Sequence, residues 1–144
     1  MGISINNINQ SGDLSCGAFS RMRKRIAELV SDELADHYKE LDELMFVTNP
    51  KDVRWKEYDA ITDKMYEEAD EVTKHVISFL YMPDVEGCLY SEQVSAVLEV
   101  CEKVYDGEKA HVYGYIAHDD AFTFGQFVEM LRECEEDMTP LWWN

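Results

Sequence analysis

Carboxylates that recur at helical spacing are the residues in this sequence whose pattern says most about chemistry. One series is Glu28, Asp32, Asp36, Glu40 and Glu43, and a second is Asp59, Asp63, Glu67, Asp70 and Glu71. Spacings of mostly three and four residues place each series along one flank of a helix, with neighbouring carboxylates about 6 Å apart along its axis. Like charges at this spacing cost a few tenths of a kcal/mol per pair. We therefore take these ten residues as the candidate partner-binding site.

The balance of charge over the whole chain favours a basic partner. Thirty Asp and Glu residues oppose 13 Lys and Arg residues among 144, which gives a formal net charge of −17. Such a chain repels nucleic acids and anionic membranes at long range and attracts basic proteins. We expect a non-enzymatic protein-binding module: an inhibitor, an immunity-type protein or a nucleic-acid mimic acting on a basic, nucleic-acid-handling partner. The alternative is a soluble domain whose charge has no specific role.

A second hypothesis, a small enzyme or a metal-binding protein, depends on His111, His118 and Asp119. Imidazole and carboxylate groups suit zinc or iron, but their spacing matches no helical i, i+4 pair. Residues 84–89 and 119–127 resemble parts of a calcium-binding loop, yet glutamine stands where that loop needs its bidentate carboxylate. The sequence also lacks a nucleophile elbow and a phosphate-binding glycine loop. We therefore predict no metal and no cofactor, and we favour enzyme activity less than binding.

Positive charge is concentrated in Arg21–Arg25, which holds four basic residues in five positions. The cluster falls in the first turns of a predicted helix, where the helix dipole disfavours cations. Lys24 can meet Glu28 one turn later. We predict that these residues neutralise acidic neighbours within the fold, and the alternative is a docking patch for an acidic or phosphate group.

The cysteine spacing and the targeting patterns of the sequence indicate the cellular compartment. The cysteines are Cys16, Cys88, Cys101 and Cys134. They are too widely spaced for the close pairs of zinc sites and redox motifs, so we expect four free thiols in a reducing environment. Neither a signal-peptide pattern nor an apolar run of about 20 residues is present. These features predict a cytoplasmic protein.

Two long amphipathic helices, over residues 16–45 and 51–81, are predicted to carry the carboxylate stripes. Apolar residues recur three and four positions apart in both segments, and Asn49-Pro50 separates them. A short link between long amphipathic helices favours antiparallel packing. Two shorter helices follow, starting near Ser91 and Thr123. The predicted fold class is thus mostly α.

The remaining segments allow an α+β variant of this fold. Residues 1–14 are expected to form an extended arm or strand, and residues 111–117 could pair with them as a small two-stranded element. Residues 141–144 are a C-terminal tail in which at least one of Trp142 and Trp143 should fold back onto the core. The whole chain, 1–144, is expected to be one domain.

Overall fold

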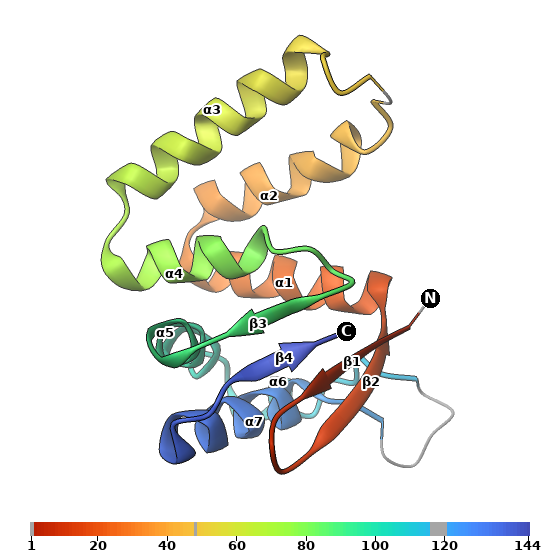
Figure 1. Ribbon diagram of the computed structural model, residues 1–144, viewed down its shortest axis with the longest axis vertical. Helices are drawn as coiled ribbons and strands as arrows, with labels where there is room; N and C mark the ends of the chain where they lie inside the picture. The colour runs from red at the N-terminus through yellow and green to blue at the C-terminus, as the bar shows by residue number, and fades with distance from the viewer. Residues whose placement is uncertain (1, 48, 116–120) are drawn as a thin grey trace.

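The computed structural model describes residues 2–47, 49–115 and 121–144, which form seven helices and a four-stranded antiparallel sheet (Figure 1). The helices are α1 (Cys16–Val30), α2 (Asp32–Leu44), α3 (Val53–Glu68), α4 (Glu71–Leu80), α5 (Ser91–Cys101), α6 (Asp106–Lys109) and α7 (Phe124–Asp137). The strands are β1 (Gly2–Asn6), β2 (Ser11–Ser15), β3 (Gly87–Leu89) and β4 (Leu141–Trp143). Helices dominate as predicted, but the fold is α+β, with more helices and a larger sheet than expected.

The helix predicted over residues 16–45 is interrupted at Ser31. This residue has an extended backbone (φ −166°, ψ 156°), and its Oγ accepts a hydrogen bond from the N–H of Leu34 at 3.1 Å. Ser31 therefore caps α2, whose first turn holds Asp32 and Glu33 where the helix dipole favours anions. The prediction of one helix was wrong because the apolar spacing continues on both sides of the cap. The one break in that spacing, at Glu33, marks the new first turn.

The helix predicted over residues 51–81 is also divided, at Ala69 and Asp70. The Asp70 carboxylate accepts a hydrogen bond from the N–H of Thr73 at 2.7 Å and thereby caps α4. This hydrogen bond lowers the pKa of Asp70, because it stabilises the charged carboxylate. Asp70 therefore ends one helix and starts the next, and it does not continue a stripe.

The antiparallel packing predicted for the two long helices is found between their halves. α2 and α3 run antiparallel and project from the rest of the molecule as a helical hairpin, while α1 and α4 lie against the body (Figure 1). We call residues 32–68 the acidic hairpin. In α3, only Tyr58 is buried.

The sheet has the strand order β2-β1-β4-β3, with every neighbouring pair antiparallel. Its registers place Ile3 opposite Leu14, and Trp142 between Asn6 and Cys88. Residues 2–15 thus form a two-stranded hairpin that pairs with the C-terminal tail, and the predicted pairing with 111–117 is reduced to a single bridge among the described residues. In the described part of the later segment, isolated bridges join Gly114 to Leu14 and Val112 to Thr123.

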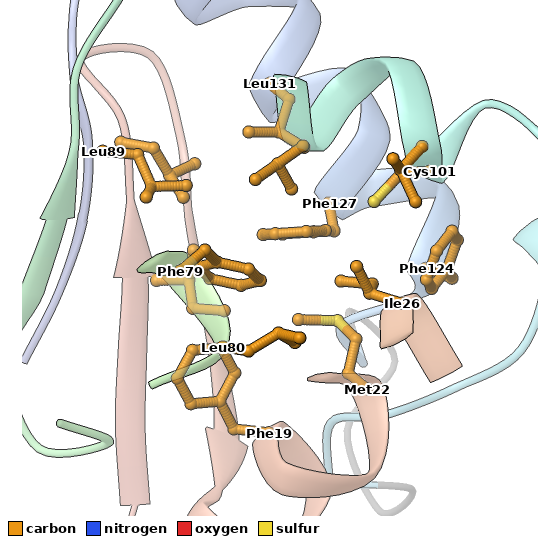
Figure 2. Close-up of a cluster of buried hydrophobic side chains, with 14 of the residues drawn as sticks. Phe19, Met22, Ile26, Phe79, Leu80, Leu89, Cys101, Phe124, Phe127 and Leu131 are labelled. Carbon is orange, nitrogen blue, oxygen red and sulfur yellow. The ribbon is translucent and has the colours of Figure 1, made fainter. Parts of the chain in front are cut away.

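The hydrophobic core lies where α1, α4, α5 and α7 meet the sheet, and Figure 2 shows part of it. Phe79 of α4 contacts Phe19 and Trp143 edge-on, with ring centroids 6.1 and 5.7 Å apart. Trp143 is 1% exposed, and its indole N–H donates to the Pro83 oxygen at 3.0 Å. The expected return of a terminal tryptophan to the core is confirmed. A Cβ at Gly87 would lie 2.1 Å from the Trp143 ring, so only glycine fits there.

All four cysteines are free, as expected; Cys101 and Cys134 are buried, whereas Cys16 and Cys88 are half-buried. None of the helices among the described residues is both long enough and apolar enough to span a membrane.

Candidate functional site

All ten carboxylates predicted to bind a partner are exposed, but the structure does not gather them into two simple stripes. Those on the acidic hairpin are Asp32, Asp36, Glu40 and Glu43 of α2, and Asp59, Asp63 and Glu67 of α3. The remaining three lie on α1, at the start of α4 and in the turn before it. The hairpin therefore carries most of the predicted site.

The three carboxylates outside the hairpin have partners within the fold. Glu28 forms ion pairs with Arg25 at 3.1 Å and with Lys39 at 3.9 Å. Glu71 lies 3.8 Å from Lys74, and Asp70 caps α4. Glu28, Asp70 and Glu71 thus have roles in local structure, and seven residues of the predicted site remain on the hairpin, of which Glu40 lies 4.0 Å from the ring of His37.

The predicted carboxylates of α3 do not face those of α2 across the hairpin. The side of α3 that borders α2 carries Arg54, Glu57 and Ile61, which line a groove with Glu40 and Glu43. At 3.6 residues per turn, the predicted α3 series lies on the other side of that helix. The hairpin therefore presents negative charge on separate flanks, with carboxylates exposed on either side of it.

A buried polar network fixes the base of the hairpin. The hydroxyl of Tyr58 donates to the backbone oxygen of His37 at 2.8 Å and also bonds the hydroxyl of Tyr81 at 2.7 Å. The His37 ring stacks on Tyr58 with centroids 4.0 Å apart. These contacts join α2 and α3 to each other and to the residue that follows α4, so they attach the hairpin to the body.

The same network sets the protonation of His37. Thr62 Oγ1 donates to the backbone oxygen of Tyr58 at 3.0 Å, so it is left to accept from His37 Nε2–H, 2.6 Å away. Burial lowers the pKa of His37 because it disfavours the imidazolium. The neutral ring is therefore the form that fits the hairpin base.

An apolar tip ends the acidic hairpin where α2 stops and α3 begins. Met45, Phe46 and Val53 are 71%, 86% and 60% exposed, and we call these three residues the apolar tip. Sequence reasoning missed it, although the adjacent Met45 and Phe46 before Asn49-Pro50 were a usable signal. Exposed large apolar side chains that gather at one place typically mark an interaction site.

The basic cluster of α1 is used inside the fold, as predicted. Arg23 is buried, and its guanidinium donates to three backbone carbonyls at the end of α4 over 2.7 to 3.3 Å. Lys24 pairs with Asp42 and not, as expected, with Glu28, while Arg25 pairs with Glu28 and with Glu108 at 3.1 and 2.8 Å. Arg23 complements the negative end of the α4 dipole, which explains why a cation lies here despite the unfavourable position in α1.

A cleft of about 560 Å³ lies between α4, α5 and the end of α7. It is lined by Glu71, Val72, His75, Ser91, Glu92, Ser95, Ala96, Glu99, Cys134, Glu135 and Met138. α7 is distant in sequence from α4 and α5, so no local pattern could have revealed this cleft. We call it the α4–α5–α7 cleft.

The second predicted site lies only partly within the described residues. His111 is exposed, and its ring lies 4.6 Å from that of Tyr113. His118 and Asp119 fall outside the described residues. Within ranges 2–47, 49–115 and 121–144, no group of three or more His, Cys, Asp or Glu side chains could hold a metal ion.

No known family model matches the chain, and no curated protein or solved structure shows significant similarity to it. The function must therefore be inferred from the charge, exposure and packing of the described residues.

Proposed function

We propose that this protein is a non-enzymatic binding module whose acidic hairpin docks on a basic protein. One observation carries the proposal: α3 is sixteen residues long and buries only Tyr58. Most helices in proteins are stabilised by packing an apolar face, and helices of this length are marginal alone in water. A helix that packs so little and is nevertheless rigidly attached is suited to present its surface to a partner.

Charge and apolar surface on the hairpin have complementary roles in docking. The exposed carboxylates attract a basic partner over a distance and orient it, which raises the association rate. Phe46 and Met45 then supply an apolar anchor of the kind that dominates binding energy once water is excluded. Because the Tyr58 network already holds the hairpin, little conformational entropy is lost on binding.

The apolar tip favours inhibitor-type docking over nucleic-acid mimicry. A mimic of phosphates needs charge alone. Phe46 is 86% exposed, and an apolar pocket on the partner would remove this side chain from water. The partner we propose therefore has a basic surface that surrounds an apolar depression. A nucleic-acid-handling enzyme would present such a basic surface.

Affinity capture with matched charge variants tests the proposal. The hairpin variant is Asp59→Asn/Asp63→Asn/Glu67→Gln, and the control is Glu86→Gln/Glu129→Gln/Glu136→Gln. All six residues are exposed and take part in none of the described ion pairs. Both variants lose the same amount of negative charge, so a difference between them reports on position and not on net charge.

The immobilised proteins are incubated with lysate of the source cell, washed with a salt gradient and analysed by mass spectrometry. We expect a basic protein that the wild type and the control release at the same salt concentration and the hairpin variant releases earlier, because salt screens exposed charges. Equal retention by the wild type and the hairpin variant would contradict the proposal. So would a neutral or acidic partner that high salt does not release.

A further inference from the structure

We propose that the α4–α5–α7 cleft is a binding site for a small organic cation with an apolar body, such as an alkylamine or arylamine. The site goes beyond the proposed docking function, and it shares no residue with the acidic hairpin. Its volume of about 560 Å³ is typical of pockets that enclose small molecules.

The floor of the cleft is apolar and is assembled from all three helices. Val72 comes from α4, Ala96 from α5, and Cys134 from α7, with Met138 just beyond it. Ala96 and Cys134 are buried, so these side chains are firmly held by the core. A hydrocarbon or aromatic body placed on this floor would leave water and gain the usual hydrophobic contribution.

The rim of the cleft is negatively charged. Glu71, Glu92, Glu99 and Glu135 line it, and the opposing positive groups are few. Lys74 lies 3.8 Å from Glu71, and His75 lies 3.5 Å from Glu92. Glu99 and Glu135 take part in none of the described ion pairs, so their charge is available to a ligand.

The arrangement of this charge selects the kind of cation. No three acidic, histidine or cysteine groups among the described residues come together closely enough to hold a metal ion. The carboxylates are instead distributed around an apolar surface, which fits an extended ligand with a charged amine at its edge. Anionic ligands of the same shape are repelled.

Two residues with a left-handed backbone lie at the edge of the cleft. Among the described residues, only Ser91 (φ 34°) and Met138 (φ 58°) have a positive φ without being glycine. Both line this cleft, one at the start of α5 and the other after the end of α7. Met138 caps α7, and its N–H donates to the Cys134 oxygen, so its conformation belongs to the end of that helix. Its side chain is 92% exposed, and a bound ligand would cover it.

The cleft is suited to binding and not to covalent chemistry. Burial raises the pKa of the Cys134 thiol, so the sulfur stays protonated and is a poor nucleophile. His75 has its described ion-pair contact with Glu92, and no described hydrogen bond links it to a serine of the cleft. We therefore expect a ligand that enters and leaves unchanged.

Three probes with the same eight-carbon tail test the site: octylamine, 1-octanol and octanoate. Binding is measured by calorimetry and mapped by chemical shifts in two-dimensional ¹H–¹⁵N spectra of the full chain. We expect octylamine to bind most tightly and octanoate least, with shifts confined to α4, α5 and the end of α7. Equal binding of amine and carboxylate, or amine-induced shifts mainly on the acidic hairpin, would overturn the proposal.

Two variants and one control distinguish binding of octylamine in the cleft from the general attraction of a cation to an acidic protein. Ser95→Trp places a large ring at an exposed lining position and should abolish octylamine binding without disturbing the core. Glu99→Gln/Glu135→Gln should weaken binding roughly three- to tenfold, as expected for two exposed charge contacts. Glu129→Gln/Glu136→Gln removes equal charge elsewhere on α7 and should leave the affinity unchanged. Unchanged affinity in Ser95→Trp, or equal losses in the two charge variants, would refute the site.

Discussion

α3 and α7 are similar in length and in the number of acidic residues they carry, but they have opposite relations to the core. α7 buries six of its fourteen residues, including Phe124 and Phe127, whereas α3 buries one of sixteen. α7 therefore belongs to the part of the molecule that maintains the fold. α3 contributes one buried residue, Tyr58, and leaves most of its surface exposed. If the proposed docking uses that surface, substitutions there should alter binding without altering stability, and substitutions in α7 should do the opposite.

The largest expected effect contrasts two phenylalanines. Phe79 is fully buried against Phe19 and Trp143, so Phe79→Ala should lower the free energy of unfolding by about 3–5 kcal/mol through lost contacts and a cavity. Phe46→Ala at the apolar tip should change it by less than about 0.5 kcal/mol. Urea unfolding followed by circular dichroism measures both. Comparable losses in the two variants would remove the distinction between core and hairpin.

Two arginines give a smaller contrast. Arg23→Gln removes a buried guanidinium that donates to three carbonyls at the end of α4 and lies over the Phe19 ring, 4.4 Å from its centroid. We expect a loss of about 2–3 kcal/mol, because those carbonyls lose charged donors. Arg54→Gln, at an exposed residue beside the groove between α2 and α3, should not change the unfolding midpoint measurably. If the two substitutions lowered the unfolding free energy equally, Arg23 would not stabilise the end of α4 as described above.

The Ser31 cap stabilises the connection between α1 in the body and α2 in the hairpin. Ser31→Ala removes the side-chain cap of α2 and should cost about 1 kcal/mol of unfolding free energy. Ser95→Ala, within the exposed face of α5, serves as the matched substitution and should be neutral or slightly stabilising, since alanine favours helix. Thermal and urea unfolding of both variants provide the measurement, and a neutral Ser31→Ala would mean that α1 and α2 do not depend on this cap.

The smallest expected effect concerns pH at the hairpin base. The pKa of His37 is lowered in the folded protein, so below about pH 6.5 the unfolded chain takes up a proton that the folded chain resists. Stability should therefore fall as pH drops from about 7.5 to 5.5. The fall should be shallower in His37→Gln, which keeps a donor for Thr62 but does not titrate. Identical pH profiles for the two proteins would show that the ring titrates freely.

Sequence patterns indicated the helical segments well and their interruptions poorly. Ser31 and Asp70 each stand inside an apolar periodicity that continues beyond them, and their capping role depends on a change of helix direction that only tertiary packing decides. The three-residue strand β3 is too short for any pattern, and β4 forms because Trp143 packs on Phe19 and Phe79.

The candidate partner-binding site could also be predicted only in part from the sequence. Exposure of the carboxylates follows from their chemistry, so their positions on the surface were predictable. Helical spacing could indicate the pair between Arg25 and Glu28, which are three residues apart, but not the pair between Glu28 and Lys39, since Lys39 lies on another helix. The α4–α5–α7 cleft was beyond prediction, because its floor needs α4, α5 and α7 to come together.

We propose that the acidic hairpin binds a partner through exposed residues that folding does not need. The most direct test is the Kd of the captured partner, measured at low and high salt for the wild type, Phe46→Ala and Asp59→Asn/Asp63→Asn/Glu67→Gln. We predict weaker binding by both variants, a reduced salt dependence only in the charge variant, and an unchanged Tm throughout. Wild-type affinity in both variants, or weakened binding that simply follows a lowered Tm, would contradict the account.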